Sequence, residues 1–252
     1  MNTSSQNPII GNPFIQLAKV DSTNNYAMAQ IHNGLAEHGT TWFTMLQTEG
    51  KGQRGKQWNA DEGLNLMQTT VLNASVFPLS NPFHLTVIVA NACYEFFSKY
   101  AGDETSIKWA NDLYWRDRKA GGILIENIIR GNKWLWAVVG VGININQTHF
   151  EGLPNPVSLK QITGKDYDPV ELGKELCTYM EKHYQRYLKI GFLPALELYN
   201  QHLYQRGNTV QLKKDNVLFS CHIKEVEENG DLIVTESSWD RFSFGEVEWV
   251  MQ

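Results

Sequence analysis

One stretch of the sequence, QTEGKGQRGKQW at residues 47–58, combines glycines with cations in a way that suits an anionic ligand. Three glycines alternate there with Lys51, Arg54 and Lys56 before the stretch closes on Trp58. Glycine lets the backbone approach a ligand closely, and the cations suit phosphate or carboxylate oxygens. Glycine and lysine are also common in ordinary surface turns. The stretch therefore indicates either an anion-binding loop or a solvated loop without a ligand.

Two further segments carry polar side chains beyond what the surrounding pattern needs. DSTNN at 21–25 precedes a helical pattern, where one hydroxyl would suffice as a helix cap. It offers three such side chains: Ser22, Thr23 and Asn24. IKWANDLYW at 107–115 carries Lys108, Asn111 and Asp112 within an apolar run, where unpaired charge would be costly. A plain helix cap and a plain β-turn explain the same residues and stay open as alternatives.

Two glycine-containing segments follow. DRKAGGILIEN at 117–127 sets Lys119 beside Gly121 and Gly122, whose backbone amides could form an anion pocket, and then carries Glu126 inward or outward. A hairpin turn with exposed charges is the alternative for this segment. VVGVGININ at 138–146 has glycines that permit close packing, and it ends with two asparagines that could orient a ligand. These are Asn144 and Asn146, in what is otherwise a core strand.

The elements that must position these residues alternate in type along the first half of the chain. Residues 14–20 and 41–47 alternate like strands, with a helix from the 21–23 corner to Gly34 between them. Residues 64–72 form another strand, so the glycine loop lies between two strands and comes beside the corner if those strands pair. Residues 82–100 have the apolar spacing of a core helix.

The second half begins with three apolar runs and ends with short strands. The runs cover 107–114, 122–130 and 134–145, and Gly131-Asn132 predicts a tight hairpin between the last two. Residues 147–167 resemble a loop, Asp168-Pro169 opens a helix, and a second helix follows Gly191. Strands at 210–212, 217–226, 232–235 and 242–249 then predict a small barrel-like unit of hairpins after Gly207.

Composition narrows the function class. With 252 residues and 42% hydrophobic residues, the chain is long and apolar enough to fold around a full core. The net charge of −5 argues against a general nucleic-acid binder, so any phosphate site must be local. The three cysteines form no CxxC pair, which indicates reduced core thiols. We expect a cytoplasmic protein, because the N-terminus lacks a signal peptide and no long apolar stretch occurs.

In this order and spacing, the five segments resemble those of the biotin protein ligases, which join biotin to a lysine of a carboxylase carrier domain. The family's Gly-Arg-Gly-Arg-x-Gly-Arg-x-Trp loop is similar to 50–58, and its Ser-Thr-Asn corner is similar to 22–24. Its Lys-Trp-Pro-Asn-Asp-Leu-Tyr motif resembles 108–114, with Ala110 for proline. Its Lys-x-x-Gly-Ile-Leu-x-Glu and Gly-Ile-Asn motifs resemble 119–126 and 142–144. The motifs cover residues 14–146, and the layout of elements resembles the family beyond them.

The resemblance implies an α+β fold in two domains. A mixed sheet packed with helices, as in class II synthetase-like catalytic domains, would occupy residues 1–206, and a small SH3-like β-barrel would occupy 207–252. The implied reaction activates biotin with ATP and Mg²⁺ to biotinyl-AMP and then transfers biotin to a lysine of a biotin carboxyl carrier domain. No DNA or membrane partner is implied. A homodimer stays open, because a sheet edge could pair with a second copy or with the carrier.

The resemblance also implies site residues. Catalysis would depend on Lys119, Arg54 and Asp112. Biotin would be bound by Ser22, Thr23, Asn24, Gln47, Lys51, Gly52, Gln53, Lys119, Gly121 and Gly122. ATP or AMP would be bound by Lys51, Arg54, Trp58, Asn111 and Asn144, with Asn111 also contacting Mg²⁺. Within these sets, Lys119 would lie between the biotin carboxylate and the α-phosphate, and Trp58 would stack on adenine.

The chain departs from the family pattern in its loop. Lys51 and Lys56 keep the charge of the family's arginines but lose their bidentate geometry, and Gln53 loses the charge, which affects how tightly the loop would hold the intermediate. Because the catalytic region begins near residue 14, we expect no DNA-binding domain before it and no repressor role.

Two alternative functions remain at this level. A lipoate or octanoate ligase or transferase would share the broad fold, but it would need an apolar tunnel and would give the Ser-Thr-Asn corner and Gln47 no role. A nonenzymatic nucleotide- or RNA-binding module would explain the glycine loop and the β-rich C-terminal part, but the acidic net charge counts against it.

Overall fold

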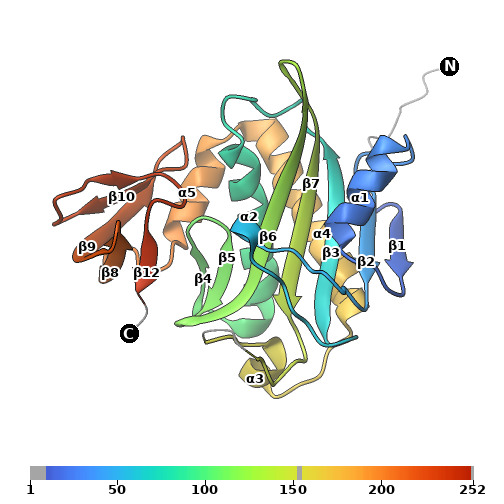
Figure 1. The fold of residues 1–252 in the computed structure, drawn as a ribbon, viewed down its shortest axis with the longest axis horizontal. Coiled ribbons are helices and arrows are strands. Elements are labelled where there is room, and N and C mark those ends of the chain that lie inside the picture. The colour runs from blue at the N-terminus through green and yellow to red at the C-terminus, as the bar shows by residue number, and fades with distance from the viewer. Residues whose placement is uncertain (1–9, 152–154, 251–252) are drawn as a thin grey trace.

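The computed structural model describes residues 10–151 and 155–250, which form two sheets with helices packed on the larger one (Figure 1). This architecture confirms the α+β class with a large mixed sheet. The expectation that the chain has no leader depends largely on residues 1–9, which lie outside the described residues. In the part that the structure describes, no helix has the length and apolar character needed to cross a membrane.

Seven strands form the larger sheet, in the order β1-β2-β3-β7-β6-β5-β4. Their bounds, in that order, are Phe14–Leu17, Thr41–Thr44, Asn65–Asn73, Lys133–Asn144, Arg118–Arg130, Asp112–Trp115 and Thr105–Lys108. β1 and β2 run parallel, whereas the other neighbouring pairs are antiparallel. The pairing of β1 with β2 brings the predicted corner and the glycine loop to the same end of the sheet.

Helices cover both faces of this sheet, which is why β3 is buried along almost its whole length. On one face, Ala27 of α1 (Thr23–His32) packs with Trp42, Val71 and Val138. The other face is covered by α2 (Phe83–Ala101), α4 (Pro169–Ile190) and α5 (Leu193–Gln201) (Figure 1). Leu72, the neighbour of Val71 on β3, points into that larger core because successive strand residues face opposite sides.

The helices begin and end close to the predicted positions. α4 starts after Asp168, whose Oδ1 accepts hydrogen bonds of 2.8 and 3.3 Å from the N–H groups of Val170 and Glu171. It ends before Gly191, as predicted. α1 starts at the corner, but the Ser22 side chain makes no capping hydrogen bond. The corner's polar side chains therefore do something other than cap the helix.

The predicted hairpin between the second and third apolar runs is confirmed. Arg130 pairs with Lys133 across the two-residue turn, and Gly131 has φ +60°, a backbone conformation that suits glycine. The three cysteines are free and buried, as predicted for core thiols, and burial raises the pKa of Cys93 to about 12.

The β-turn alternative for 107–115 is supported, whereas two other predictions of local structure are wrong. The run at 107–114 divides into two strands, β4 and β5, because the chain turns at 109–111 and pairs Lys108 with Asp112. The stretch at 147–167 contains a short helix, α3 (Leu159–Thr163), held by a capping box of Ser158 and Gln161. The strand at 242–249 is two short strands, β11 (Arg241–Phe242) and β12 (Glu248–Val250), separated by a turn.

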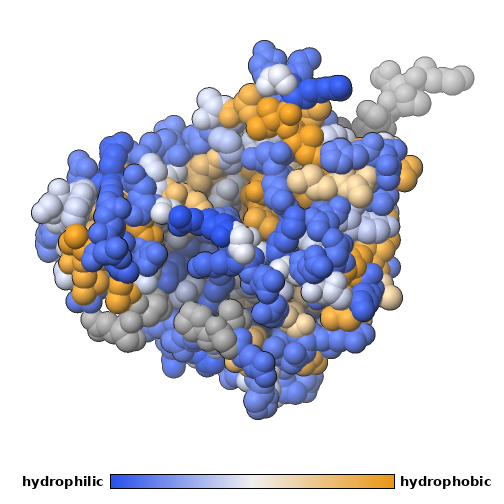
Figure 2. Space-filling model, viewed as in Figure 1, coloured by the Kyte–Doolittle hydropathy of each residue, from blue (hydrophilic) through white to orange (hydrophobic). Residues whose placement is uncertain are grey.

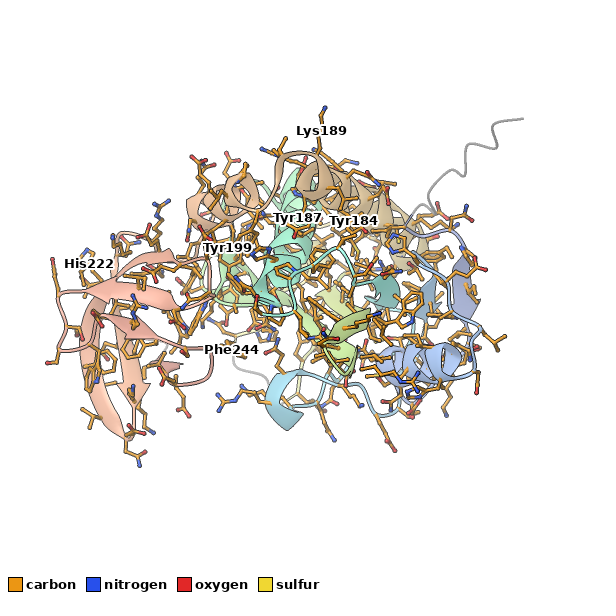
Figure 3. The ribbon with its side chains drawn as sticks, turned by 90° about the horizontal axis from the view of Figure 1, so that it is seen from above. Tyr184, Tyr187, Lys189, Tyr199, His222 and Phe244 are labelled. Atoms are coloured by element: carbon orange, nitrogen blue, oxygen red, sulfur yellow. The ribbon has the colours of Figure 1, made fainter. Side chains whose placement is uncertain are left out.

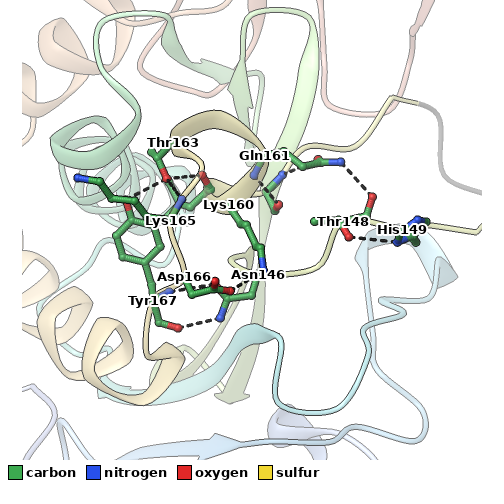
Figure 4. Close-up of polar contacts among 11 residues, drawn as sticks. Asn146, Thr148, His149, Lys160, Gln161, Thr163, Lys165, Asp166 and Tyr167 are labelled. Carbon is green, nitrogen blue, oxygen red and sulfur yellow. Dashed lines mark hydrogen bonds and ion pairs between the residues drawn. The ribbon is translucent and has the colours of Figure 1, made fainter.

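Side-chain hydrogen bonds fix the segment around α3 (Figure 4). Asn146 donates to the carbonyl of Tyr167 at 2.7 Å, and Gln161 donates to the carbonyl of Thr148 at 3.0 Å. These contacts hold the chain that leaves β7 against the chain that enters α4.

The C-terminal strands form a second sheet of five strands, in the order β11-β10-β9-β8-β12. Its remaining strands are β8 (Thr209–Lys214), β9 (Val217–Val226) and β10 (Leu232–Thr235), and all of its pairs are antiparallel. This sheet lies beside the larger one (Figure 1). Between the sheets, Ile107 of β4 donates to His202 and accepts from Tyr204, each at 2.8 Å.

Candidate functional site

The polar corner lies against the end of β2. A bridge between Val20 and Gln47 brings the two segments together. Gln47 Oε1 accepts a hydrogen bond from the N–H of Thr23 at 2.8 Å and lies 3.1 Å from the Thr23 hydroxyl oxygen. Ser22, Thr23 and Asn24 are all buried. The structure thus brings together the four residues that the sequence assigned to one part of the site.

Asn24 is held by two residues that the sequence did not assign to the site. Its Nδ2 donates to Glu126 Oε2 at 2.7 Å, and its Oδ1 accepts from Thr69 Oγ1 at 2.6 Å. A Cβ at Gly140 would lie 2.3 Å from Asn24 Oδ1, so only glycine leaves room for this amide. The sequence contained one indication of Thr69, a hydroxyl side chain within the strand predicted at 64–72. Glu126 lies in the quoted segment at 117–127 but was not assigned to the site.

The glycine loop forms a strap with its own internal hydrogen bonds. Trp58 N–H donates to Gly50 at 2.8 Å, and Gly52 N–H donates to Lys56 at 2.7 Å. Arg54 at its tip has φ +56°, a strained conformation for a residue other than glycine. Hydrophilic side chains cross the centre of the molecular face at the position of this loop (Figure 2).

A cleft of about 480 Å³ separates the strap from β6. It is lined by residues that include Gly50, Lys51, Gly52, Arg54, Lys56, Leu124 and Glu126. Lys51 Nζ lies 3.8 Å from Glu126 Oε1 across it. The cleft therefore combines exposed cations with backbone amides, which suits an anion such as phosphate.

Trp58 closes the strap against the sheet. Its ring lies over β7 so closely that a Cβ at Gly142 would come within 2.6 Å of it. The indole Nε1 is buried and has no hydrogen-bond partner among the described residues. A buried donor without a partner is costly, so this position suits a ligand that supplies an acceptor.

Lys119 and Asp112 form an ion pair farther along β6, beyond the residues that line the cleft, with Nζ and Oδ1 2.7 Å apart. Both side chains are partly exposed, at 36% and 26%. Lys119 Nζ also lies 3.6 Å from where a Cβ at Gly122 would stand. Since a strand rises about 3.3 Å per residue, the ammonium group is roughly 13 Å along β6 from Glu126. An elongated ligand could contact both the cleft under the strap and the ammonium group of Lys119.

Other predicted residues support the strands. Asn111 Nδ2 donates to the carbonyl of Ile123 at 2.7 Å, and Asn144 Nδ2 donates to the carbonyl of Val157 at 3.1 Å. Gln53 Nε2 reaches the same carbonyl of Ile123 at 3.4 Å. A Cβ at Gly121 would lie 2.8 Å from the carbonyl oxygen of Gly142, which explains the glycine there. The amide donors of Asn111 and Gln53 thus fasten two other segments to β6, and that of Asn144 fastens β7 to the segment before α3.

The C-terminal sheet touches two of the polar segments. Arg54 donates to the carbonyl of Gly245 at 3.1 Å, and Trp109 Nε1 donates to the carbonyl of Gly230 at 2.9 Å. The ring of Phe244 stands 5.7 Å from that of Trp109, between the two sheets (Figure 3). The C-terminal sheet is therefore joined to the strap and to the turn between β4 and β5.

Lys108 lies near the C-terminal sheet. Its ammonium group is 3.1 Å from the Tyr114 hydroxyl and 5.1 Å from the centre of the Trp249 ring. Burial lowers the pKa of Lys108 to about 8. Within the described residues, no group of three acidic, histidine or cysteine side chains is arranged to hold a metal.

Comparisons with known proteins place the chain in a family. A family model described as the biotin/lipoate A/B protein ligase family matches residues 17–144, about half of the chain. The bifunctional ligase/repressor BirA of Bacillus spizizenii is 26% identical over 231 residues, covering 90% of this chain and 70% of that protein. The biotin–[acetyl-CoA-carboxylase] ligase of Mycobacterium tuberculosis is 27% identical over 168 residues, covering 66% of this chain and 61% of that protein.

Among solved structures, that of the Aquifex aeolicus biotin protein ligase in complex with biotin and ATP is similar with a TM-score of 0.77. It is 24% identical in sequence, and the match covers 95% of this chain and 99% of that one. This likeness shows that the whole described fold, including the C-terminal sheet, is shared.

Proposed function

The chain belongs to the biotin/lipoate A/B protein ligase family, and we infer that within it the protein is a biotin protein ligase. It activates biotin with ATP to biotinyl-AMP and transfers the biotinyl group to a lysine of a biotin carboxyl carrier domain. One observation carries this proposal. Segments from five parts of the chain converge along β6, with a buried polar corner at one end, a cationic strap over the middle and the Lys119–Asp112 pair at the other.

The chemistry has two steps. A carboxylate oxygen of biotin attacks the α-phosphorus of ATP, and pyrophosphate leaves with the electrons of the broken P–O bond. The lysine amine then attacks the carbonyl carbon of the mixed anhydride, AMP leaves, and the amine loses a proton. Both steps concentrate negative charge at one place, and preorganised donors that stabilise such charge are usually the largest catalytic contribution.

The polar corner suits the ureido ring of biotin. Thr23 and Gln47 already hydrogen-bond to each other, so their remaining donors and acceptors are held in place before a ligand arrives. A buried ring with one carbonyl and two N–H groups needs such partners. Ser22 lies beside them at the start of α1. Asn24 joins the corner to Glu126 on β6 and to Thr69 on β3 through hydrogen bonds.

The strap and the ion pair suit the phosphates. Lys119 would lie between the biotin carboxylate and the α-phosphate, and its partner Asp112 would accept a proton from the acceptor lysine. Lys51 and Arg54 would contact the phosphates from the strap. The buried Nε1 of Trp58 supports a place for adenine beside it, because a nucleotide would supply the missing acceptor. Mg²⁺ would be held by Asn111, Asp112 and the phosphate oxygens.

The carrier domain would dock on the open edge of β6. β5 pairs with β6 only as far as Gly122, whereas β7 pairs with it up to Arg130. In the described part of the chain, no strand covers the other side of 124–130. An extended segment of the carrier, or β6 of a second copy in a homodimer, could add a strand there.

We also place the protein in the cytoplasm, where ATP and carboxylases meet. We divide the chain into a catalytic domain at 1–206 and a C-terminal domain at 207–252 that forms an SH3-like barrel. The contacts of Arg54 and Trp109 with the C-terminal sheet support a role for that domain in completing the site.

The proposal is tested by pyrophosphate exchange. Purified protein is incubated with ATP, Mg²⁺ and labelled pyrophosphate, with biotin, lipoate or octanoate as the carboxylate. Label should enter ATP only when biotin is present, and mass spectrometry should then find biotin on one lysine of a carrier domain from the same cell. Exchange that depends on lipoate or octanoate instead would identify the alternative reaction, and no exchange with any of the three would refute the proposal.

A further inference from the structure

Glu126 belongs to one of the quoted motifs, and the proposed mechanism gives it no role. It lies on β6, at the point where the strap crosses the strand, and its side chain is 28% exposed. Its two carboxylate oxygens have different partners: Oε2 accepts a hydrogen bond from Asn24 at 2.7 Å, and Oε1 lies 3.8 Å from Lys51 Nζ. One carboxylate thus touches both the corner and the strap.

We propose that Glu126 is a positioning residue that couples the polar corner, where biotin binds, to closure of the strap over the nucleotide. This inference rests on the proposed function. It assigns Glu126 no contact with either substrate, because its oxygens are directed at Asn24 and Lys51.

The first link orients the corner. An ionised carboxylate can only accept hydrogen bonds, so it fixes the NH₂ group of Asn24 toward β6. The Asn24 oxygen then faces Thr69, whose hydroxyl must donate to it at 2.6 Å. The Thr69 oxygen is 2.8 Å from the Thr23 hydroxyl, which is 3.1 Å from Gln47 Oε1. The charge on Glu126 therefore sets which atoms of the corner are donors and which are acceptors.

The second link holds the strap. Lys51 is 42% exposed, so its ion pair with Glu126 is weak in the free protein and the strap can still move. When biotin fills the corner and excludes water from Asn24 and Glu126, the same pair becomes less screened and stronger. Occupation of the corner should therefore draw Lys51, and with it the strap, toward β6.

The test compares Glu126→Gln with wild type by calorimetry and by hydrogen exchange of the 50–58 peptide. Glutamine keeps the size of the side chain and an acceptor for Asn24 but removes the charge. Biotin should bind about fivefold more weakly, the difference between a charge-assisted and a neutral hydrogen bond. Saturating biotin should slow exchange of the 50–58 peptide in wild type, and the variant should lose this protection even at saturation. Glu62→Gln, which removes an exposed carboxylate on the segment after the strap, should behave as wild type.

A double variant separates coupling from a general structural effect. Lys51→Met should also lose the protection by biotin, and adding Glu126→Gln to it should change exchange of the strap no further, because both act through one contact. Lys51 is partly exposed, so this variant tests the link even if Glu126→Gln fails to fold.

Each result is decisive. If biotin-saturated Glu126→Gln or Lys51→Met protects the strap as wild type does, or if biotin gives wild type itself no protection, the coupling is refuted while the ligase assignment stands. If wild type binds no biotin in calorimetry, the proposed function fails, and the coupling fails with it.

Discussion

Arg54 Nη1 donates a hydrogen bond of 3.1 Å to the carbonyl oxygen of Gly245, although the two residues are 191 positions apart in the chain. The contact ties the tip of the strap to the turn between β11 and β12. The contact engages the guanidinium group of Arg54, so under the proposed function the nucleotide would compete with Gly245 for that group.

Replacing Gly245 by alanine should free the strap. Gly245 has φ +91°, and a Cβ there would lie 2.9 Å from Arg54 Nη1, so the contact cannot persist. Trypsin should then cut after Arg54 severalfold faster in the ligand-free variant. Gly207→Ala is the matched control, because Gly207 has φ +76° but nothing within 4 Å of an added Cβ. Equal cleavage rates in the two variants would show that the contact does not restrain the strap.

Lys119→Gln should abolish most adenylate formation and leave the fold intact. Removing one preorganised donor to a developing charge costs about a hundredfold or more in rate. The side chain is 36% exposed, so its loss leaves no cavity in the core. Pyrophosphate exchange measures the first effect and thermal unfolding the second, with Lys133→Gln on the distant hairpin as the control. Pyrophosphate exchange near the wild-type rate would show that Lys119 only forms an ion pair with Asp112 and does not act in adenylate formation.

Gly140→Ala and Gly142→Ala should separate the two halves of the site. An added Cβ would lie 2.3 Å from Asn24 Oδ1 in the first variant and 2.6 Å from the Trp58 ring in the second. Gly140→Ala should therefore raise KM for biotin, and Gly142→Ala should raise KM for ATP. A lost base–aromatic stack is worth about 1–3 kcal/mol, so the rise in KM for ATP should be roughly fivefold or more. If each variant raises both constants equally, the two substrates do not occupy these separate places.

Acid should destabilise the fold through half-buried histidines. Burial lowers the pKa of His202, whose ring stacks on that of Tyr94 with the ring centres 3.8 Å apart. Below pH 6.5 the unfolded chain therefore binds a proton at this residue more readily than the folded chain does. Stability from this group is complete above its ordinary pKa of 6.5 and is lost as pH falls from there toward the folded-state pKa. One such histidine changes the free energy of unfolding by at most about 1.4 kcal/mol per pH unit, and this is its contribution to the slope of stability against pH.

Urea unfolding between pH 7.5 and 5 measures this slope. His202→Gln should give a shallower loss of stability than wild type, whereas His32→Gln at the exposed end of α1 should give the wild-type slope. Parallel curves for wild type and His202→Gln would contradict the assignment of this proton to His202. His38 and His84, whose pKa values burial also lowers, should keep part of the slope in both variants.

The sequence could predict what local patterns determine. Gly131-Asn132 specified the β6–β7 hairpin because two-residue turns need such residues, and Asp168-Pro169 specified the start of α4. The run at 107–114 was harder, since its turn residues are embedded among apolar ones that continue the strand pattern. α3 was missed because its five residues are too few for a helical period, although its Ser158–Gln161 capping signature was present.

In the site, order and spacing identified the segments, and the structure shows Ser22, Thr23 and Gln47 side by side. The direction of Glu126 could not be read from the sequence, because both faces of β6 border other parts of the protein and alternation then carries no signal. The hydrogen bond between Arg54 and Gly245 could not be predicted from the sequence either. It depends on how two separate sheets pack together, and neither local pattern contains that information.

The hydrogen bonds that Ile107 makes with His202 and Tyr204 have a consequence for biosynthesis. β4 leaves the ribosome roughly a hundred residues before the segment that covers its outer side, which at about 5–20 residues per second means roughly 5–20 s. During that time the backbone groups of the strand have no partner on that side, and they form an edge that other chains can join. Nascent chains that stall, or messages that stop, before residue 202 should therefore yield fragments that associate with one another.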